Sequence, residues 1–364
     1  MTTPYTPLVS VVIPTYQRPD LLMTRSLPSA LGQWYERLEV VVVVDGPDAV
    51  TEQALTDLAA RDLRVRPVFL PRNMGGSDAR NAGVQAARGE WIAFLDDDDE
   101  WLPHNLEQHL EAVAQRVNGE RRWLVSVCGS LTRTPDGDLA NPQRLPDAHE
   151  PLGDYILARR TFRERECSFM TSAIFCSREL LLAHPFRSGL PRHQDWDWVL
   201  RIAATSEVSF RFSQEIATIW YHGEARRQIS NSLNWSQSLA WIQICRQQHL
   251  VTDKAMVGFL NRSVADYARR SGDYHALPIL VKMMVAAHAR PFEWLYFIAI
   301  WTTPTFLRAW IRRFRAQRVW LRRGNKNIGI VMHQQDTVPK RVAAQHQAGL
   351  SPVDLHPEHG KGAD

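Results

Sequence analysis

The stretch WIAFLDDDDEW, from Trp91 to Trp101, joins a short apolar run to four consecutive aspartates. The apolar run predicts a buried strand. Four like charges at a strand end repel one another, and capping a following helix (expected at Leu102–Gln115) needs only one or two of them. A bound divalent cation explains all four better than a solvated turn does, because Mg²⁺ and Mn²⁺ prefer carboxylate oxygens.

Upstream of the aspartates, apolar runs alternate with helical segments. Strands are expected at Leu8–Pro14, Glu39–Asp45 and Val65–Leu70, and helices at Pro19–Leu31 and Ser77–Arg88, the second with Gly89 as its C-cap. This alternation predicts an α/β fold with a Rossmann-like, mostly parallel sheet flanked by helices. Ligands bind such sheets beyond the carboxyl ends of the strands, so the polar residues that follow these strands should converge there.

The rest of the chain changes character twice. Strands mixed with helices are expected at Trp123–Thr132, Thr171–Cys176 and Val208–Phe212. After Ser230 the sequence is typical of helices, and from Gln334 it is polar and expected to be disordered. We therefore expect an α/β domain over residues 1–230, a helical C-terminal appendage over 231–333 and a disordered tail over 334–364.

The cysteines and the N-terminus bear on the cellular compartment. The four cysteines lie far apart with no Cys-x-x-Cys pair, which argues against a zinc site or a disulfide framework and fits a reducing cytosol. The N-terminal sequence MTTPYTPLVS has neither a basic region nor an apolar core, so no secretion is expected.

A second acidic cluster occurs in PRHQDWDWVLRIA, from Pro191 to Ala203. Asp195 can begin a helix there, but a carboxylate beside tryptophans and near arginine is equally a candidate for a tuned pKa and a role as general base. Asp197 is expected to be structural, because Arg201 follows four residues later on the same helix face.

Taken together, these motifs resemble family 2 glycosyltransferases of the GT-A fold, over about Val9 to Ser230. The matching segments are VVIPTYQRPDLL, VVVVDGPD, LPRNMGGSDARNAGVQAARGEWIAFLDDDD and QDWDWVLR. The resemblance implies an inverting enzyme that transfers a sugar from a nucleoside-diphosphate sugar to an acceptor hydroxyl. It also implies Mg²⁺ or Mn²⁺ as cofactor. The expectation of a cell-surface glycan or lipid-linked acceptor rests instead on the basic C-terminal region.

The same resemblance implies roles for individual residues. Asp195 would be the catalytic base, and Asp98, with Asp96, would hold the metal. His222 could be a further metal ligand, or part of an exposed basic loop. Donor binding would involve Pro14, Thr15, Tyr16, Arg18, Asp45, Arg72, Asn73, Gly75, Gly76, Arg80, Asp96, Asp97, Arg226 and Arg227.

The sequence departs from the family pattern at three positions. Val44 stands where an acidic residue is common, Gln17 where asparagine is, and Gln194 where glutamate is. The Gln-x-x-Arg-Trp signature of processive members is missing, which predicts the addition of one or few sugars per encounter. The main alternative is a catalytically silent nucleotide-sugar-binding or membrane-scaffold protein. A nucleotidyltransferase fits less well, because PTYQRPD has no glycine-rich loop.

The C-terminal region combines apolar and basic residues. Trp294–Leu307 has no charge but is only 14 residues long, short of the roughly 20 that span a bilayer. Seven arginines and no acid follow between Arg308 and Arg323, interleaved with aromatics. This pattern favours a helix on an anionic membrane surface over a solvated basic helix. We therefore expect a protein peripheral to the cytoplasmic face of the membrane, and no nucleic-acid partner.

Overall fold

The computed structural model describes residues 6–115, 121–135, 137–160, 167, 169–223 and 234–303. All of these lie within one compact unit, residues 1–316, and a second unit, residues 317–364, is outside the described part. The predicted basic segment Arg308–Arg323, the predicted tail from Gln334, and Arg226 and Arg227 also lie outside the described residues.

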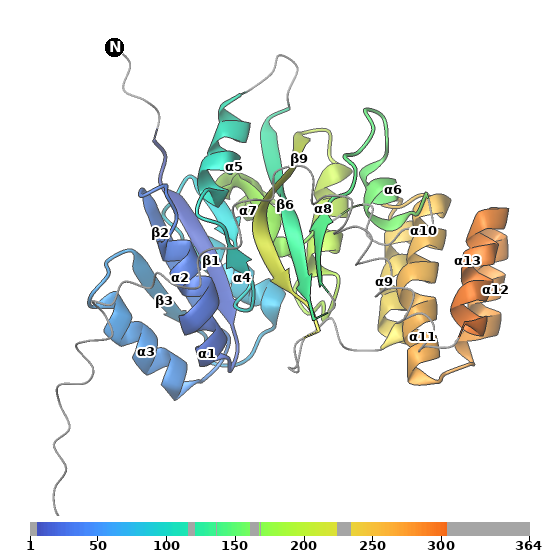
Figure 1. Cartoon of the computed structure of the whole chain (residues 1–364), viewed down its shortest axis with the longest axis horizontal. Helices are drawn as coiled ribbons and strands as arrows, with labels where there is room; N and C mark the ends of the chain where they lie inside the picture. The colour runs from blue at the N-terminus through green and yellow to red at the C-terminus, as the bar shows by residue number, and fades with distance from the viewer. Residues whose placement is uncertain are drawn as a thin grey trace, which may run out of the picture. The chain divides into compact units, whose positions relative to one another are not determined.

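The described strands form one mixed sheet (Figure 1). Its order is β3-β2-β1-β4-β8-β6-β9-β5, with β7 paired to β6. The strands are β1 (Val9–Thr15), β2 (Leu38–Val44), β3 (Val65–Phe69), β4 (Trp91–Phe94), β5 (Glu100–Trp101), β6 (Trp123–Thr134), β7 (Gly137–Asn141), β8 (Ile174–Ser177) and β9 (Val208–Tyr221). Strands β1 to β4 are parallel, as the sequence predicts, whereas β8 pairs antiparallel with both β4 and β6.

Helices flank this sheet and continue into a helical region at its far side (Figure 1). They are α1 (Pro19–Leu21), η1 (Leu22–Ser26), α2 (Leu27–Leu31), α3 (Ala49–Ala59), α4 (Gly76–Ala86), α5 (Asn105–Ala114), α6 (Leu152–Leu157), η2 (Thr171–Ala173), α7 (Arg178–Ala183), α8 (Gln194–Ala203), α9 (Trp235–Gln247), α10 (Asp253–Phe259), η4 (Leu260–Ala265), α11 (Asp266–Ser271), α12 (Ala276–Ala286) and α13 (Pro291–Thr302).

The valine-rich strand β2 is buried along its whole length because both faces of the sheet are covered. Val41 and Val43 belong to one apolar cluster, which includes residues of α4. Val40 and Val42 belong to a second cluster with residues of α2 and α3. Each fully buried valine stabilises the fold by about 1.5 kcal/mol or more, which explains why this strand carries no alternation of polar residues.

Two sequence predictions about element ends need correction. Helix α4 ends at Ala86 with Ala87 as its C-cap, so Gly89 is not the cap. A Cβ on Gly89 would lie 2.6 Å from the backbone nitrogen of Ser10, so this glycine allows the chain to pass close to β1. Strand β9 continues to Tyr221, well past Phe212, because it pairs in parallel with the whole of β6.

The helical region packs closely against the sheet domain. Helix α10 approaches the end of α6 so tightly that a Cβ on Gly258 would lie 2.4 Å from the carbonyl oxygen of Leu157. On α9, the Trp241 indole donates a hydrogen bond of 3.1 Å to buried Asp197 of α8. The helices after residue 234 therefore help to fix the position of α8, which carries the second acidic cluster.

Candidate active site

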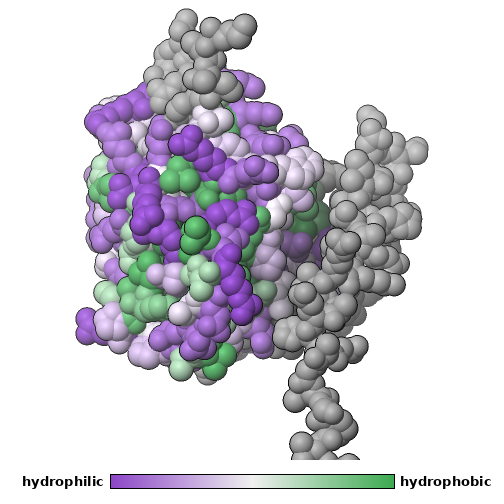
Figure 2. Space-filling model, turned by 90° about the vertical axis from the view of Figure 1, so that its left-hand side faces the viewer, coloured by the Kyte–Doolittle hydropathy of each residue, from purple (hydrophilic) through white to green (hydrophobic). Residues whose placement is uncertain are grey.

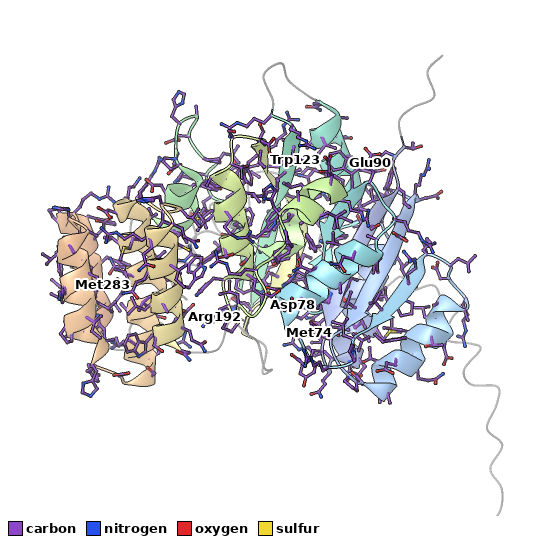
Figure 3. The ribbon with its side chains drawn as sticks, turned by 180° about the vertical axis from the view of Figure 1, so that it is seen from behind. Met74, Asp78, Glu90, Trp123, Arg192 and Met283 are labelled. Carbon is purple, nitrogen blue, oxygen red and sulfur yellow. The ribbon has the colours of Figure 1, made fainter. Side chains whose placement is uncertain are left out.

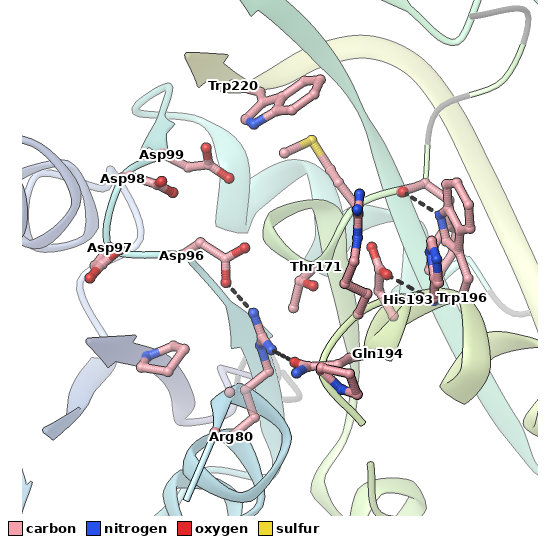
Figure 4. Close-up of a pocket in the computed structure, with 18 of the residues that line it drawn as sticks. Arg80, Asp96, Asp97, Asp98, Asp99, Thr171, His193, Gln194, Trp196 and Trp220 are labelled. Carbon is pink, nitrogen blue, oxygen red and sulfur yellow. Dashed lines mark hydrogen bonds and ion pairs between the residues drawn. The ribbon is translucent and has the colours of Figure 1, made fainter. Parts of the chain in front are cut away.

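A cavity of about 660 Å³ opens at the carboxyl ends of β1, β2 and β4 (Figure 4). Side chains from the sheet, from α8 and from the helical region line it. Most residues predicted from the sequence are among its lining residues, namely Pro14, Thr15, Tyr16, Arg18, Asp45, Asn73, Gly75, Gly76, Arg80, Asp96, Asp97, Asp98 and Asp195. The structure thus brings together residues that are up to 181 positions apart in the chain, from Pro14 to Asp195.

The aspartate run forms the loop that follows β4. Asp97 is buried and accepts hydrogen bonds from the Thr15 hydroxyl at 2.8 Å and from Arg18 at 3.0 Å. Burial and the neighbouring Asp98 raise the pKa of Asp97 to about 6. Arg18 also lies 3.2 Å from a carboxylate oxygen of Asp98, so one guanidinium offsets the repulsion between two of the four charges.

Arg80 links the two acidic segments of the cavity. It is buried on α4, forms an ion pair with Asp96, and donates a hydrogen bond of 2.7 Å to the side-chain oxygen of Gln194 (Figure 4). Gln194 is the residue that departs from the expected glutamate. Its neutral amide accepts from Arg80 without adding another negative charge to the cavity.

Asp45 holds the loop that precedes α4. Its two carboxylate oxygens accept backbone hydrogen bonds from Met74 at 2.7 Å and Gly75 at 2.9 Å. Gly46, with φ of 107°, permits the close approach, since a Cβ there would lie 2.7 Å from the backbone nitrogen of Asn73. Asp45 therefore stabilises this loop, in addition to the contact with the nucleoside that the sequence predicts.

Asp195 lies in the first turn of α8, which follows His193 in a left-handed conformation with φ of 60°. Its carboxylate accepts a hydrogen bond of 2.9 Å from the backbone nitrogen of Trp196. Although the residue keeps some exposure to the cavity, desolvation of the carboxylate raises the pKa of Asp195 to about 6. Arg80 opposes this rise, and Asp96 adds to it.

Asp197 occupies the opposite side of the same helix and is fully buried. Arg201 contacts it at 2.9 Å, as the sequence spacing predicts, and Arg187 lies at 3.3 Å. Because its carboxylate is also bonded to Trp241, Asp197 fixes α8 and leaves Asp195 as the carboxylate of this segment that lines the cavity.

Two predicted residues are not brought to the cavity. Arg72 is exposed and is not among the lining residues. His222 follows β9, where its backbone nitrogen donates to the Arg133 carbonyl and its ring lies 4.8 Å from that of Trp220. It does not line the cavity with Asp98.

Sequence reasoning missed several lining residues. Arg262, Ser263 and Tyr267 come from η4 and α11, in a segment without a recognisable motif. Trp196 and Arg192 also line the cavity, although the sequence predicts no role for them beyond being close to Asp195. The tryptophans that follow His193 in the sequence could have indicated an aromatic cluster. The other members of that cluster, Trp241 and Phe259, are distant in sequence and contact the His193 ring only in the fold.

The carboxylates suit a hard divalent cation that takes only part of its ligands from protein. Asp96 and Asp98 offer oxygen donors to the same cavity. Among the described residues, no group of three or more His, Cys, Asp or Glu side chains is arranged to hold a metal. This donor set fits Mg²⁺ or Mn²⁺, which commonly bind through one or two carboxylates and complete their coordination with phosphate and water.

The sheet and its cavity define an α/β fold of the GT-A type. A crystal structure of S. aureus TarS 1–349 in complex with UDP-GlcNAc superposes with a TM-score of 0.53 at 17% identity, covering 87% of this chain and 92% of that one. Residues 10–179 match the model of the family "Glycosyl transferase family 2". This part of the chain belongs to that family.

Curated relatives agree with this assignment. The chain is 28% identical over 210 residues to the amylovoran biosynthesis glycosyltransferase AmsB of Erwinia amylovora, covering 56% of this chain and 65% of the relative. It is 38% identical over 149 residues to the succinoglycan biosynthesis protein ExoO of Rhizobium meliloti, covering 40% and 41%. The matches thus span less than two thirds of these relatives' own lengths.

Proposed function

We propose that this protein is an inverting glycosyltransferase that transfers a sugar from a nucleoside-diphosphate sugar to an acceptor hydroxyl. The observation that carries the proposal is that Asp195 lines the same cavity as the aspartates after β4. A base on one wall and a group of carboxylates suited to a metal on the other are the two chemical elements that such a transfer needs.

Asp195 acts as the general base. With a pKa raised to about 6, its carboxylate is ionised near neutral pH and is more basic than an exposed aspartate. It takes the proton of the acceptor hydroxyl as that oxygen attacks the anomeric carbon, and the bond to the diphosphate breaks on the opposite side. The configuration at the anomeric carbon is therefore inverted.

The other wall holds the donor. Asp98 and Asp96 would hold a Mg²⁺ or Mn²⁺ ion, which when bound neutralises charge on the departing diphosphate. Tyr16, Asn73, Gly75 and Gly76 line the same cavity and would contact the nucleoside. Arg80 keeps Asp96 and Gln194 in fixed positions, so donor wall and base helix are held together through one side chain.

The relatives suggest a biological setting. Their names include the biosynthesis of amylovoran and succinoglycan and, for TuaG of Bacillus subtilis (35% identical over 114 residues), putatively of teichuronic acid. We infer that this chain builds a cell-surface polysaccharide, with a glycan or lipid-linked acceptor. The TarS complex with UDP-GlcNAc supports a nucleotide sugar as donor.

The helical region supports a location at the membrane surface. No helix in the described ranges is long and apolar enough to cross a bilayer. Helices α12 and α13 nevertheless expose Ile279, Val285, Leu295 and Ile298, each at least 43% accessible. Near α3, by contrast, apolar residues are scattered among hydrophilic ones (Figure 2). With the arginines that follow Leu307, the exposed apolar side chains suit the cytoplasmic face of an anionic membrane.

A thermal-shift titration with UDP, GDP and dTDP, with and without Mn²⁺, tests the donor site. A ligand that binds only the folded protein raises the Tm, so one diphosphate should stabilise the protein in a metal-dependent way. The shift should disappear in Asp98→Ala and persist in Asp57→Ala, which alters an exposed aspartate on α3. Folded protein that responds to none of the diphosphates would instead favour the silent scaffold.

Cosedimentation with phosphatidylglycerol vesicles tests the membrane surface. Leu295→Asp and Ile298→Asp should each release the protein, whereas Leu63→Asp, at a position 90% exposed on the sheet domain, should not. Binding that is unchanged in both α13 variants would contradict the role of this face.

A further inference from the structure

The cavity wall formed by the helical region differs chemically from the wall formed by the strand ends. Its lining residues include Arg192 before α8, Arg262 and Ser263 of η4, and Tyr267 of α11. Figure 3 labels Arg192 where the helices meet the sheet domain. None of the lining residues from the segment 234–303 is acidic.

The arginines of the two walls have different partners. On the strand side, Arg18 pairs with Asp97 and Asp98, and Arg80 pairs with Asp96. On the helical side, Arg262 donates to the Ile156 carbonyl at 3.3 Å and lies 5.5 Å from the Trp196 ring, and no carboxylate within the described ranges forms an ion pair with it. Its positive charge is therefore only partly compensated by a neutral carbonyl and a ring face.

Arg192 is held in place beside it. Its guanidinium donates to the Tyr267 hydroxyl at 2.9 Å and lies 4.5 Å from the centre of that ring. The Tyr267 phenol therefore helps to orient this guanidinium at the wall of the cavity. Two cationic groups, a phenol and a serine hydroxyl thus line one side of the cavity.

The imidazole of His193 lies near both arginines and is itself buried. Burial together with Arg192 and Arg262 lowers the pKa of His193 to about 3, so this imidazole stays neutral. Its ring stacks on Trp196 and Trp241, and its Nε2 lies 3.0 Å from the Ser238 hydroxyl. His193 therefore acts as a spacer between the base helix and α9, and adds no charge to the cavity.

We propose that Arg262 and Arg192 bind an anionic group, a carboxylate or a phosphate, on the acceptor. This inference rests on the proposed function, because it takes Asp195 as the base that the acceptor hydroxyl must reach. Asp195 and Trp196 line the same cavity as the two arginines and the donor aspartates. Figure 4 shows Trp196 on the side of the cavity away from Asp96, Asp97 and Asp98. An anion held by the arginines, with a sugar ring against Trp196, orients the acceptor hydroxyl toward Asp195.

Direct binding of small probes tests the proposal. The protein, saturated with its nucleoside diphosphate and Mn²⁺, is titrated with methyl β-glucuronide, glucose 6-phosphate and methyl β-glucoside, and binding is followed by ligand-observed NMR. At least one anionic probe should bind about tenfold more tightly than the neutral glucoside, because charge-assisted hydrogen bonds contribute on this scale. A preference for the glucuronide indicates an acidic sugar, and a preference for the sugar phosphate indicates a phosphate-bearing acceptor.

Variants then assign the binding to the arginines. Arg262→Gln should lose most of the preference for the anion, Arg262→Lys should keep part of it, and Arg270→Gln, on the exposed end of α11, should behave as wild type. All three should retain the thermal shift with the nucleoside diphosphate. Equal binding of neutral and anionic probes, no binding of either anionic probe, or an unchanged preference in Arg262→Gln would overturn the proposal.

The two proposals fail in different ways. Absence of a metal-dependent shift with every nucleoside diphosphate in the wild-type protein counts against the glycosyltransferase function. The ratio between anionic and neutral probes is measured on the protein both with and without nucleoside diphosphate, so it decides the anion site even if no diphosphate binds.

Discussion

The two walls of the cavity are made by different means. The strand-side wall is formed at the carboxyl ends of β1, β2 and β4, and its centre is the run of four aspartates after β4. Arg18, just before α1, and Arg80, on α4, compensate for the repulsion between these aspartates. The helical wall gathers single residues from α8, η4 and α11, and aromatic stacking on His193 holds them together. The first wall is therefore acidic and consists of short motifs that follow parallel strands, whereas the second is aromatic and basic and consists of single residues without a motif.

This difference separates what each wall contributes. Carboxylates whose charges are compensated by arginines suit a site that binds a metal and a diphosphate. The diphosphate has the same geometry in many sugar donors. An aromatic and basic wall, by contrast, depends on the shape and charge of one acceptor. The proposed base, Asp195, lies where the two walls meet, so variants of α8 can distinguish an effect on the reaction from an effect on the stability of the helix.

The largest effect is expected for Asp195→Asn. Removal of the base should lower the transfer rate by about 10²–10⁴-fold while the metal-dependent nucleotide shift remains. The ionised carboxylate is disfavoured by its surroundings, as its raised pKa shows, so the neutral amide should leave the Tm equal or higher. The measurements are sugar transfer by the variant and its melting curve with and without nucleotide. A variant that transfers sugar at the wild-type rate would refute the assignment of the base.

The next effect concerns stability, and it contrasts the two carboxylates of α8. Asp197→Ala leaves Arg201 and Arg187 without their buried partner and should destabilise the protein by about 3–5 kcal/mol. Urea unfolding of this variant beside Asp195→Asn measures the difference. If Asp197→Ala unfolded at the same urea concentration as Asp195→Asn, α8 would not depend on the buried network.

The difference between the two walls also explains which parts of the fold and site could be predicted from the sequence. The strands β1 to β4, the pairing of Asp197 with Arg201 and the convergence of Thr15, Asp45 and Asp96 follow from local patterns and from the rule that parallel strands end at one edge. Arg262 and Tyr267 could not be found this way, because their place in the cavity depends on how α10 and η4 pack on α6. Arg72 stays a prediction: it is exposed and does not line the cavity, although its neighbours Asn73 and Gly75 do.

A smaller effect is expected from pH. Asp195 must be ionised to accept a proton. Burial raises its pKa to about 6; the charge of Asp96 adds to this rise, and the charge of Arg80 opposes it. Transfer should therefore be constant above pH 7 and fall about tenfold per pH unit below 6. A profile of kcat between pH 4.5 and 8 measures this, on protein whose melting curve shows it folded throughout. An apparent pKa near 4 would mean that the base is an exposed carboxylate instead.

The smallest effect is expected for Trp241→Phe, which removes one hydrogen bond from the support of α8. The Trp241 indole donates to Asp197, but Arg201 and Arg187 still pair with that carboxylate in the variant. A phenyl ring keeps most of the stacking on His193, so the loss should be about 1 kcal/mol in the free energy of unfolding.

Transfer at saturating acceptor should change little, whereas the KM for acceptor should rise, because α9 supports the helical wall and does not touch the donor side. Phe259→Leu, which alters a neighbouring contact of His193 without touching Asp197, serves as the matched control for lost aromatic packing. If Trp241→Phe weakened nucleotide binding as much as it raised the KM for acceptor, the two walls would have to be treated as one mechanical unit.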